Sequence, residues 1–354
     1  MSNSETIYLD HAASTPCHPQ VVEAMLPYFT DIYGNASGLH RQARASARAI
    51  EQARQQVAEI LGCAPREIIF TACGPESDNL AIRGVAWAQK QAGKGNHLIT
   101  SPVEHHAVGH TITQLCDQFG FEQTVVPVDR YGQVNPDDVT AAIRPETTLI
   151  SIMYANNEVG TIQPIAEIGA LARAHDIYFH TDAVQAAAYE PLRVAELNVD
   201  LLAISGHKIY APKGIGILYV RKNTPLLPAF TGGGHEQNRR PGTENVPYIV
   251  GIATALDLIE THRAAENSRQ AALRDKLITG ILERISDSEV TGHPTQRLPN
   301  NASFVFAGCE ADAILMHLDL AGIQAASGSA CSTGMPEPSH VLSAMGLPHA
   351  LALG

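Results

Sequence analysis

Short apolar runs alternate with longer amphipathic stretches through the first two thirds of the chain. The runs lie between polar or turn-forming residues, as buried strands do, and the stretches carry apolar residues at helical spacing. The pattern predicts strands at residues 67–71, 97–100, 124–128, 149–154, 177–181 and 201–204, with a further apolar run at 217–220. It predicts helices at residues 40–62, 76–91, 103–119, 135–143 and 165–175.

This alternation of strands and helices implies a mostly parallel central sheet with helices on both faces. The last third of the chain is predicted to contain one long helix or two over residues 248–285, followed by a strand, a helix and a strand at 302–306, 311–320 and 323–327. We therefore expect an α/β fold with a large domain over residues 18–255. A smaller α/β domain would combine residues 1–17 with 256–354.

Composition narrows the class of protein. The chain has 354 residues and a formal net charge of -12, which argues against nucleic-acid binding. No apolar run is long enough for a membrane span, and no secretory signal precedes the first expected strand. The six cysteines form no C-x-x-C pair, which fits reduced thiols. We expect a cytoplasmic enzyme with no resident metal.

Chemically useful side chains follow nearly every predicted strand. Ligands of open α/β sheets bind at the carboxyl ends of the strands, so these side chains are candidates for one site. Lys208 follows the 201–204 run, where partial desolvation would favour a neutral amine that reacts with carbonyls. The candidates at these ends are Gly74, Pro75, His105, Asn157, Asp182, Gln185, Ser205, His207 and Lys208.

One cofactor, pyridoxal phosphate, has a use for each of these groups. Lys208 would bind its aldehyde, and Asp182 would keep its pyridine nitrogen protonated. His105 would stack on the ring, Gln185 would donate to the phenolic oxygen, and Asn157 would serve the same edge or the substrate. The phosphate would lie at the helix start, next to Gly74, Pro75, Ser205 and His207. Each residue alone also has a structural explanation, as a cap, a turn former or a solvated side chain. Their occurrence at one sheet edge favours the cofactor site.

Several motifs resemble those of cysteine desulfurases of the NifS/IscS type, which are pyridoxal-phosphate enzymes with the class V aminotransferase fold (fold type I). The motifs are Ser-Gly-His-Lys at 205–208, His-Thr-Asp-Ala-Val-Gln at 180–185, Asn-Asn-Glu-Val-Gly at 156–160 and Gly-Thr-Glu-Asn at 242–245. They occur in the family's order over nearly the whole chain. The resemblance implies a homodimer in which Thr243 reaches the cofactor phosphate of the partner subunit.

Cys331 lies in a run of small residues, Ser-Gly-Ser-Ala-Cys, that resembles the persulfide-forming loop of this family. The resemblance implies that Lys208 moves the Cα proton of L-cysteine, with His105 as a further proton carrier. It implies that the Cys331 thiolate takes the sulfur, leaving L-alanine. The persulfide would pass to a sulfur-acceptor or iron-sulfur scaffold protein, for iron-sulfur cluster assembly or thiolation. Cys331 is also a candidate ligand of a nascent iron-sulfur cluster.

The sequence departs from the family pattern at two places. The family usually has threonine where this chain has Pro75, and proline offers neither a hydroxyl nor an N–H to the phosphate. The family also continues past Gly354 into a strand with an arginine that pairs with the substrate carboxylate. We therefore expect weaker phosphate binding and an incomplete C-terminal part of the small domain.

Three functions remain open from the residues. A cysteine desulfurase is favoured. A selenocysteine lyase or an aminotransferase of the same fold is the first alternative, and an aminotransferase would not need Cys331. The second alternative is a non-catalytic scaffold that binds sulfur-acceptor proteins.

Overall fold

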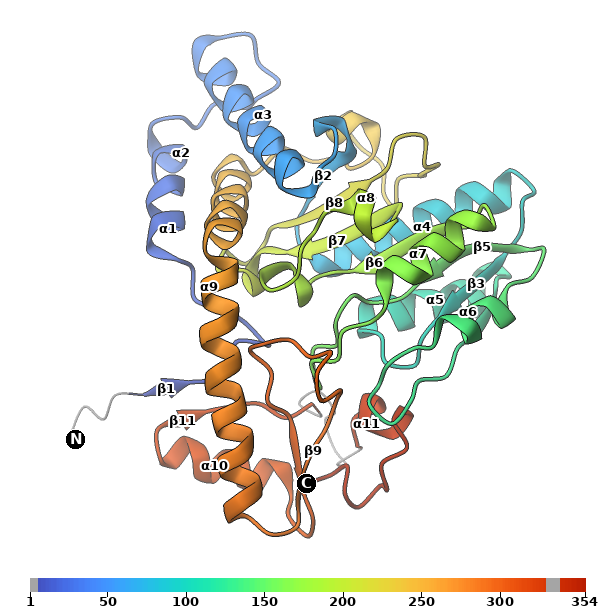
Figure 1. Ribbon diagram of the computed structural model, residues 1–354. Helices are drawn as coiled ribbons and strands as arrows, with labels where there is room; N and C mark the ends of the chain where they lie inside the picture. Colours follow the sequence, from blue (N-terminus) through green and yellow to red (C-terminus); the bar gives the residue numbers. More distant parts are fainter. Residues whose placement is uncertain (1–5, 329–337) are drawn as a thin grey trace.

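A seven-stranded sheet forms the centre of the computed structural model, which describes residues 6–328 and 338–354 (Figure 1). Its strands lie in the order β2-β8-β7-β6-β5-β3-β4. They are β2 (Ile68–Thr71), β3 (His97–Thr100), β4 (Glu122–Val125), β5 (Thr147–Ser151), β6 (Tyr178–Asp182), β7 (Leu201–Ser205) and β8 (Gly216–Val220). All neighbours run parallel except β8, which pairs antiparallel with β2 and with β7. The sheet is therefore mostly parallel, as the sequence predicts.

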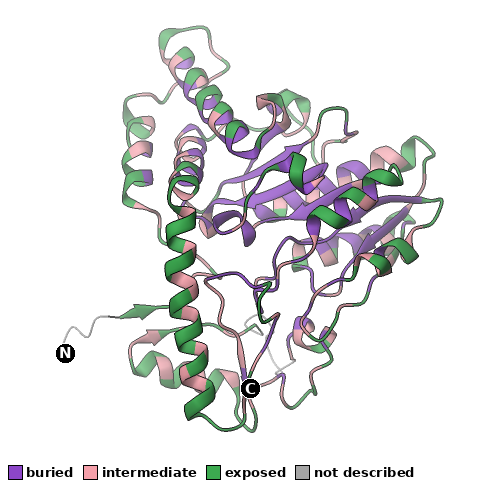
Figure 2. Ribbon diagram, viewed as in Figure 1, coloured by how far each residue is buried: buried purple, intermediate pink, exposed green. Residues whose placement is uncertain are grey.

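Helices cover both faces of this sheet, and alternate strand residues pack on each face. On one face, Ile69, Leu98 and Leu149 belong to a hydrophobic cluster that also includes residues of α4 and α5. Ile68 and Phe70 point the other way, into a cluster that includes residues of α3, α7 and α9. Figure 2 shows the strands buried between these layers. The covering helices are α3 (Arg41–Leu61), α4 (Gly74–Gln91), α5 (His106–Phe119), α6 (Pro136–Ala142), α7 (Ile165–Ala174) and α8 (Val194–Leu197).

The long helix α9 (Val246–Arg284) joins the sheet to the rest of the chain (Figure 1). Its first turns are buried, whereas Leu273, Leu277 and Leu282 are exposed. Small pairs of strands lie at its far end: β1 (Ile7–Tyr8) is parallel to β11 (Ile323–Gln324), and β9 (Ser288–Val290) is antiparallel to β10 (Phe304–Phe306). The remaining helices are α1 (Pro19–Met25), α2 (Pro27–Thr30), α10 (Ala311–Leu320) and α11 (His340–Ala344).

The observed elements correct two details of the sequence prediction. The edge strand β4 begins at Glu122, two residues before the expected start at Thr124, and its first residues are exposed and polar. An apolar-run criterion misses such a start because an edge strand buries little of its surface. The stretch 248–285, expected as one helix or two, is the single helix α9, which ends at Arg284. Within the described residues, no helix is long and apolar enough to cross a membrane.

Candidate active site

Lys208 lies in the short helical turn η3 (Gly206–Lys208) that directly follows the central strand β7. Its Nζ donates hydrogen bonds to the carbonyl oxygens of Ala12 and Ala13, the latter at 2.8 Å. Burial lowers the pKa of Lys208, and the nearby carboxyls of Asp10 and Asp182 only partly oppose this effect. The amine is therefore more readily deprotonated than an exposed lysine, as a nucleophile for carbonyls needs to be.

Asp182 ends the neighbouring strand β6, so its carboxyl group lies at the same edge of the sheet. Its Oδ1 accepts a hydrogen bond of 2.8 Å from the Val184 N–H. Burial raises the pKa of Asp182, whereas His105, the Val184 N–H and Lys208 lower it. Gln185 follows in the same loop, and its Nε2 donates to the Ala12 carbonyl at 2.9 Å. Lys208 and Gln185 thus share one backbone acceptor.

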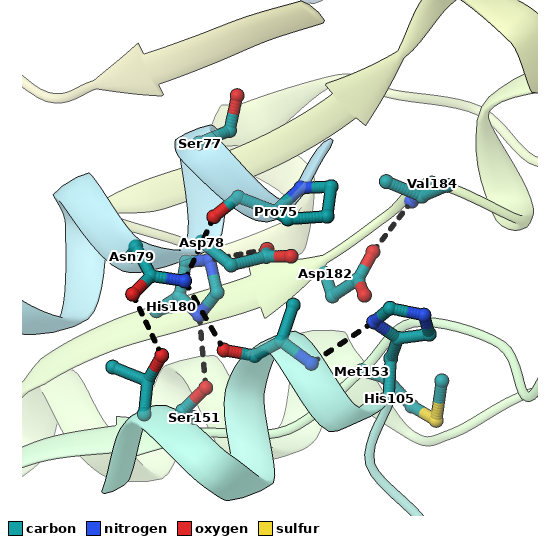
Figure 3. A network of polar contacts seen from close by, with 12 residues as sticks. Pro75, Ser77, Asp78, Asn79, His105, Ser151, Met153, His180, Asp182 and Val184 are labelled. Carbon is teal, nitrogen blue, oxygen red and sulfur yellow. Dashed lines mark hydrogen bonds and ion pairs between the residues drawn. The ribbon is translucent and has the colours of Figure 1, made fainter. Parts of the chain in front are cut away.

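His105 is the N-cap of α5, and its Nδ1 accepts a hydrogen bond of 3.1 Å from the Ala107 N–H. The neutral ring therefore carries its proton on Nε2. Figure 3 shows His105 beside Asp182. Desolvation lowers the pKa of His105, Asp182 raises it and Lys208 lowers it again. His105 and Asp182 thus lie side by side, and Lys208 is near enough to influence the pKa of both.

A candidate anion site adjoins these groups at the start of α4. Gly74 is the first residue of this helix, and the N-cap side chain makes no capping hydrogen bond. A Cβ at Gly74 would lie 2.9 Å from Val184 Cγ2 and 3.2 Å from Ser205 Cβ, so the backbone is packed closely against the ends of β6 and β7. Ser205 Oγ is buried and has no hydrogen-bond partner among the described residues. A helix N-terminus beside an unpaired hydroxyl suits a phosphate.

Pro75 follows Gly74 at this helix start, and His207 follows Ser205 by two residues. Pro75 occupies the first turn of α4, where the missing N–H breaks no helical hydrogen bond. His207 Nδ1 lies 3.4 Å from Ser14 Oγ. Burial, together with the positive charges of Lys208 and Lys213, lowers the pKa of His207 to about 4. His207 can therefore offer a phosphate a hydrogen bond but no positive charge at neutral pH.

Asn157 lies in the turn after β5, but its neighbour Asn156 builds that turn. Asn156 Oδ1 accepts from the Glu158 and Val159 N–H groups at 2.8 and 2.9 Å, and its Nδ2 donates to the Val103 carbonyl at 2.9 Å. Asn156 is fully buried, whereas Asn157 is partly exposed. Asn156 therefore has a structural role, whereas Asn157 occupies a position that a ligand can reach.

Cys331 lies outside the described residues. The residues on either side of 329–337 both contact the side chain of Glu158. Glu158 Oε2 accepts a hydrogen bond from Ser339 Oγ. The same oxygen lies so close to Gly328 that a Cβ there would come within 2.2 Å. Glu158 therefore contacts both flanks of residues 329–337. Thr243 is exposed in the loop before α9.

Three buried side chains near the site were given no role from the sequence: Asp78, Ser151 and His180. They form a chain of polar contacts behind Asp182 (Figure 3). One signal was available, because His180 lies two residues before Asp182 and therefore points to the same face of its strand. The contact with Asp78 required the packing of α4 on β6. Among the described residues, no group of three His, Cys, Asp or Glu side chains is arranged to hold a metal ion.

Comparisons with known proteins show the family of the chain. The aminotransferase class-V family model matches residues 7–350. The chain is 49% identical to the cysteine desulfurase IscS of Methanosarcina thermophila over 353 residues, covering 100% of this chain and 86% of that protein. It is 50% identical over 348 residues to the cysteine desulfurase IscS of Dictyoglomus turgidum, covering 98% and 88%.

Solved structures give the same result. A NifS-like protein superposes with a TM-score of 0.91 at 34% identity, over 99% of this chain and 92% of that one. A structure described as SspA in complex with cysteine superposes with a TM-score of 0.82 at 38% identity, over 98% and 96% of the two chains. The α/β fold of pyridoxal-phosphate enzymes of fold type I, expected from the sequence, is thus confirmed. The chain belongs to the aminotransferase class-V family and, within it, to the cysteine desulfurases.

Proposed function

We propose that this chain converts L-cysteine to L-alanine and a persulfide on Cys331, from which the sulfur passes to another protein. One observation carries the proposal: the Lys208 amine and the Asp182 carboxyl group follow the adjacent parallel strands β7 and β6, and the His105 ring, at the start of α5, lies beside Asp182. The choice of L-cysteine as substrate rests on the similarity of the chain, over nearly its full length, to proteins named cysteine desulfurase.

The residues present fit pyridoxal phosphate, the cofactor of this family. The unpaired Ser205 hydroxyl and the start of α4 at Gly74 are suited to its phosphate, with Pro75 and His207 beside them. The groups that would hold the rest of the cofactor are Asp182 for the ring nitrogen, Gln185 and Asn157 for the phenolic edge, His105 for the ring face and Lys208 for the aldehyde. When bound, the cofactor supplies an electron sink for negative charge at the substrate Cα.

Lys208 is the group that removes the Cα proton in this proposal. Its lowered pKa favours the neutral amine, which can accept a proton at Nζ and return it to carbon. The Ala12 and Ala13 carbonyls hold Nζ in place without competing for the proton, because a carbonyl oxygen is a very weak base. His105 Nε2 is the proton carrier for the substrate sulfur, because Nδ1 is occupied by its cap.

Cys331 is the sulfur acceptor in this proposal. Its thiolate attacks the sulfur of L-cysteine, so an S–S bond forms while the C–S bond breaks. The electron pair of the C–S bond remains with carbon, which takes up a proton and leaves as alanine. Because a reactive thiol has to stay reduced, we infer that the protein works in a reducing compartment such as the cytoplasm.

We further infer that the protein acts as a homodimer and delivers sulfur to an acceptor or iron-sulfur scaffold protein. Thr243 would reach the phosphate of the partner subunit, which its exposed position before α9 permits. We also propose two domains, residues 18–255 and residues 1–17 with 256–354. The change in α9 from a buried first part to an exposed second part supports a boundary near residue 255.

The decisive test is the release of alanine from L-cysteine by the purified protein supplied with pyridoxal phosphate and a thiol reductant. We expect equal amounts of alanine and sulfide, and loss of both in a Cys331→Ala variant that still binds the cofactor. If Cys331→Ala released sulfide at the full rate, a lyase without a cysteine nucleophile would replace the proposal. If the wild-type protein bound no cofactor, the scaffold alternative would be favoured.

A further inference from the structure

A buried chain of three polar side chains lies directly behind Asp182 (Figure 3). His180 precedes Asp182 by two residues on β6, Asp78 follows Gly74 by four residues in α4, and Ser151 ends β5. Each of the three is at most 1% exposed. His180 Nδ1 lies 2.8 Å from Ser151 Oγ, and His180 Nε2 lies 3.5 Å from Asp78 Oδ1. The imidazole ring thus joins three elements of the site.

Asp78 Oδ1 and His180 Nε2 face each other as a possible acceptor and a possible donor. Neither Asp78 Oδ1 nor His180 Nε2 has a hydrogen-bond partner in residues 6–328 and 338–354, so the 3.5 Å contact between them is the polar approach that each atom makes. Burial lowers the pKa of His180 to about 3, so the ring is neutral and carries one N–H. If the Ser151 hydroxyl donates to Nδ1, that N–H is on Nε2 and points to Asp78. Nδ1 then has a hydrogen bond, and the Nε2–H lies 3.5 Å from Asp78 Oδ1 as a polar contact.

Asp78 and Asp182 differ in what surrounds them. Burial raises the pKa of Asp78 well above its ordinary value, and the carboxyl groups of Asp182 and Glu104 raise it further. Burial also raises the pKa of Asp182, but His105 and Lys208 lower it. The surroundings of Asp78 therefore favour its neutral form, whereas His105 and Lys208 favour the charged form of Asp182.

We propose that Asp78, His180 and Ser151 form a positioning chain that fixes α4 against β6 through an uncharged contact. The two elements carry groups suited to opposite ends of one ligand, since Gly74 opens α4 and Asp182 ends β6. A contact one helical turn from Gly74 and two residues from Asp182 would hold these groups at the separation that pyridoxal phosphate requires. This positioning role rests on the proposed function in one respect, which is that the bound ligand is pyridoxal phosphate.

Two substitutions of Asp78 in the full-length holoenzyme test the chain. Asp78→Asn keeps a neutral acceptor for the His180 N–H, and we expect its cofactor release rate to remain within about twofold of wild type. Asp78→Ala removes the polar contact of that N–H, and we expect release to be about tenfold faster. Samples saturated with pyridoxal phosphate are also titrated, and the pH midpoint of their visible absorbance should move in Asp78→Ala alone.

Two further variants complete the experiment. Ser151→Ala removes the contact on the other side of the His180 ring, and we expect it to release cofactor faster as well, even if Asp78→Ala does not fold. Ser46→Ala, at a buried position in α3, is the control for removing a buried hydroxyl, and it should leave release and midpoint unchanged.

Several outcomes would overturn the proposal. If Asp78→Asn were as impaired as Asp78→Ala, a charge on Asp78 would be required and the contact would not be neutral. If Asp78→Ala and Ser151→Ala only lowered the melting temperature, without changing release or midpoint, the chain would serve general stability alone. Cofactor binding is measured without L-cysteine, so an absence of alanine release would refute the proposed reaction and leave this test intact.

Discussion

At the scale of single residues, the reactive amine is held by backbone carbonyls rather than by a paired carboxylate. Lys208 Nζ donates to Ala13 O at 2.8 Å and also to Ala12 O, whereas Asp10 and Asp182 act on it through space. A direct carboxylate partner would favour the charged ammonium form. Carbonyl partners orient the amine while burial keeps its pKa low, which is what a proton acceptor at neutral pH requires.

Thr15 provides a test of this orientation. Its Oγ1 donates to the His207 carbonyl at 3.0 Å and accepts from the Tyr210 N–H at 2.8 Å, so it ties down the chain on both sides of Lys208. We expect Thr15→Val to lower kcat/KM by about tenfold, because a small displacement of a reacting group is costly. Thr15→Ser keeps the hydroxyl and should restore most of the activity. Equal rates for Thr15→Val and wild type, measured by alanine release, would contradict the prediction.

His97 makes the stability of the sheet depend on pH. Its ring lies 2.7 Å from Thr147 Oγ1 and 2.9 Å from Thr124 Oγ1, and burial lowers its pKa to about 4. Between about pH 6.5 and 4 the unfolded chain binds a proton at this ring and the folded chain does not. His97 therefore makes stability fall as the pH decreases through this window.

The slope of stability against pH can be compared even if a His97 variant is less stable at every pH. In His97→Gln we expect the pH dependence of the free energy of unfolding to be shallower by up to about 1.4 kcal/mol per pH unit over this window. Denaturant titrations at several pH values measure it. Unchanged slopes would show that the ring is protonated in the folded protein.

At the scale of elements, the strands that carry the site were the most predictable part of the molecule. Residues 201–204 form an uninterrupted apolar run because β7 is buried on both faces, and Lys208 follows where that run ends. The exposed edge strand β4 lacks this signal, which explains the error at its start. The residues of β8 also do not indicate its antiparallel direction, because strands of either direction can be buried and apolar.

The proline at the start of α4 gives a prediction at this scale. Pro75 removes one N–H from the helix end that faces the anion site, next to Gly74. We expect Pro75→Thr, which regains an N–H and a hydroxyl, to release pyridoxal phosphate several-fold more slowly. Pro136→Thr, at the start of α6, is the matched control for losing a helix-initiating proline. Equal release rates for Pro75→Thr and wild type would defeat this explanation.

At the scale of the whole molecule, the limit of sequence reasoning is the contact between distant elements. Asp182 and Lys208 were predictable because each follows its own strand. The meeting of Asp78 with His180 depends on how α4 lies across β6, which no local pattern encodes. The bonds from Lys208 to Ala12 and Ala13 were also hidden, because they join residues about 195 positions apart through backbone atoms.

The proposed homodimer predicts that defects in different subunits complement each other. If Thr243 completes the site of the partner subunit, Lys208→Ala and Thr243→Ala subunits can form mixed dimers in which one site has both original residues. We expect the mixture, after subunit exchange, to release alanine faster than either variant alone. A mixture no more active than the sum of its parts would place Thr243 outside the partner's site.

The central claim is that Lys208 and Asp182 face one pyridoxal-phosphate ring. The visible absorption spectrum of the purified protein saturated with pyridoxal phosphate tests it most directly, with Lys208→Ala measured beside wild type. The account predicts a visible band in wild type that persists after free cofactor is removed, and that is absent from Lys208→Ala. A Lys208→Ala protein that keeps the same band after that removal would contradict the account.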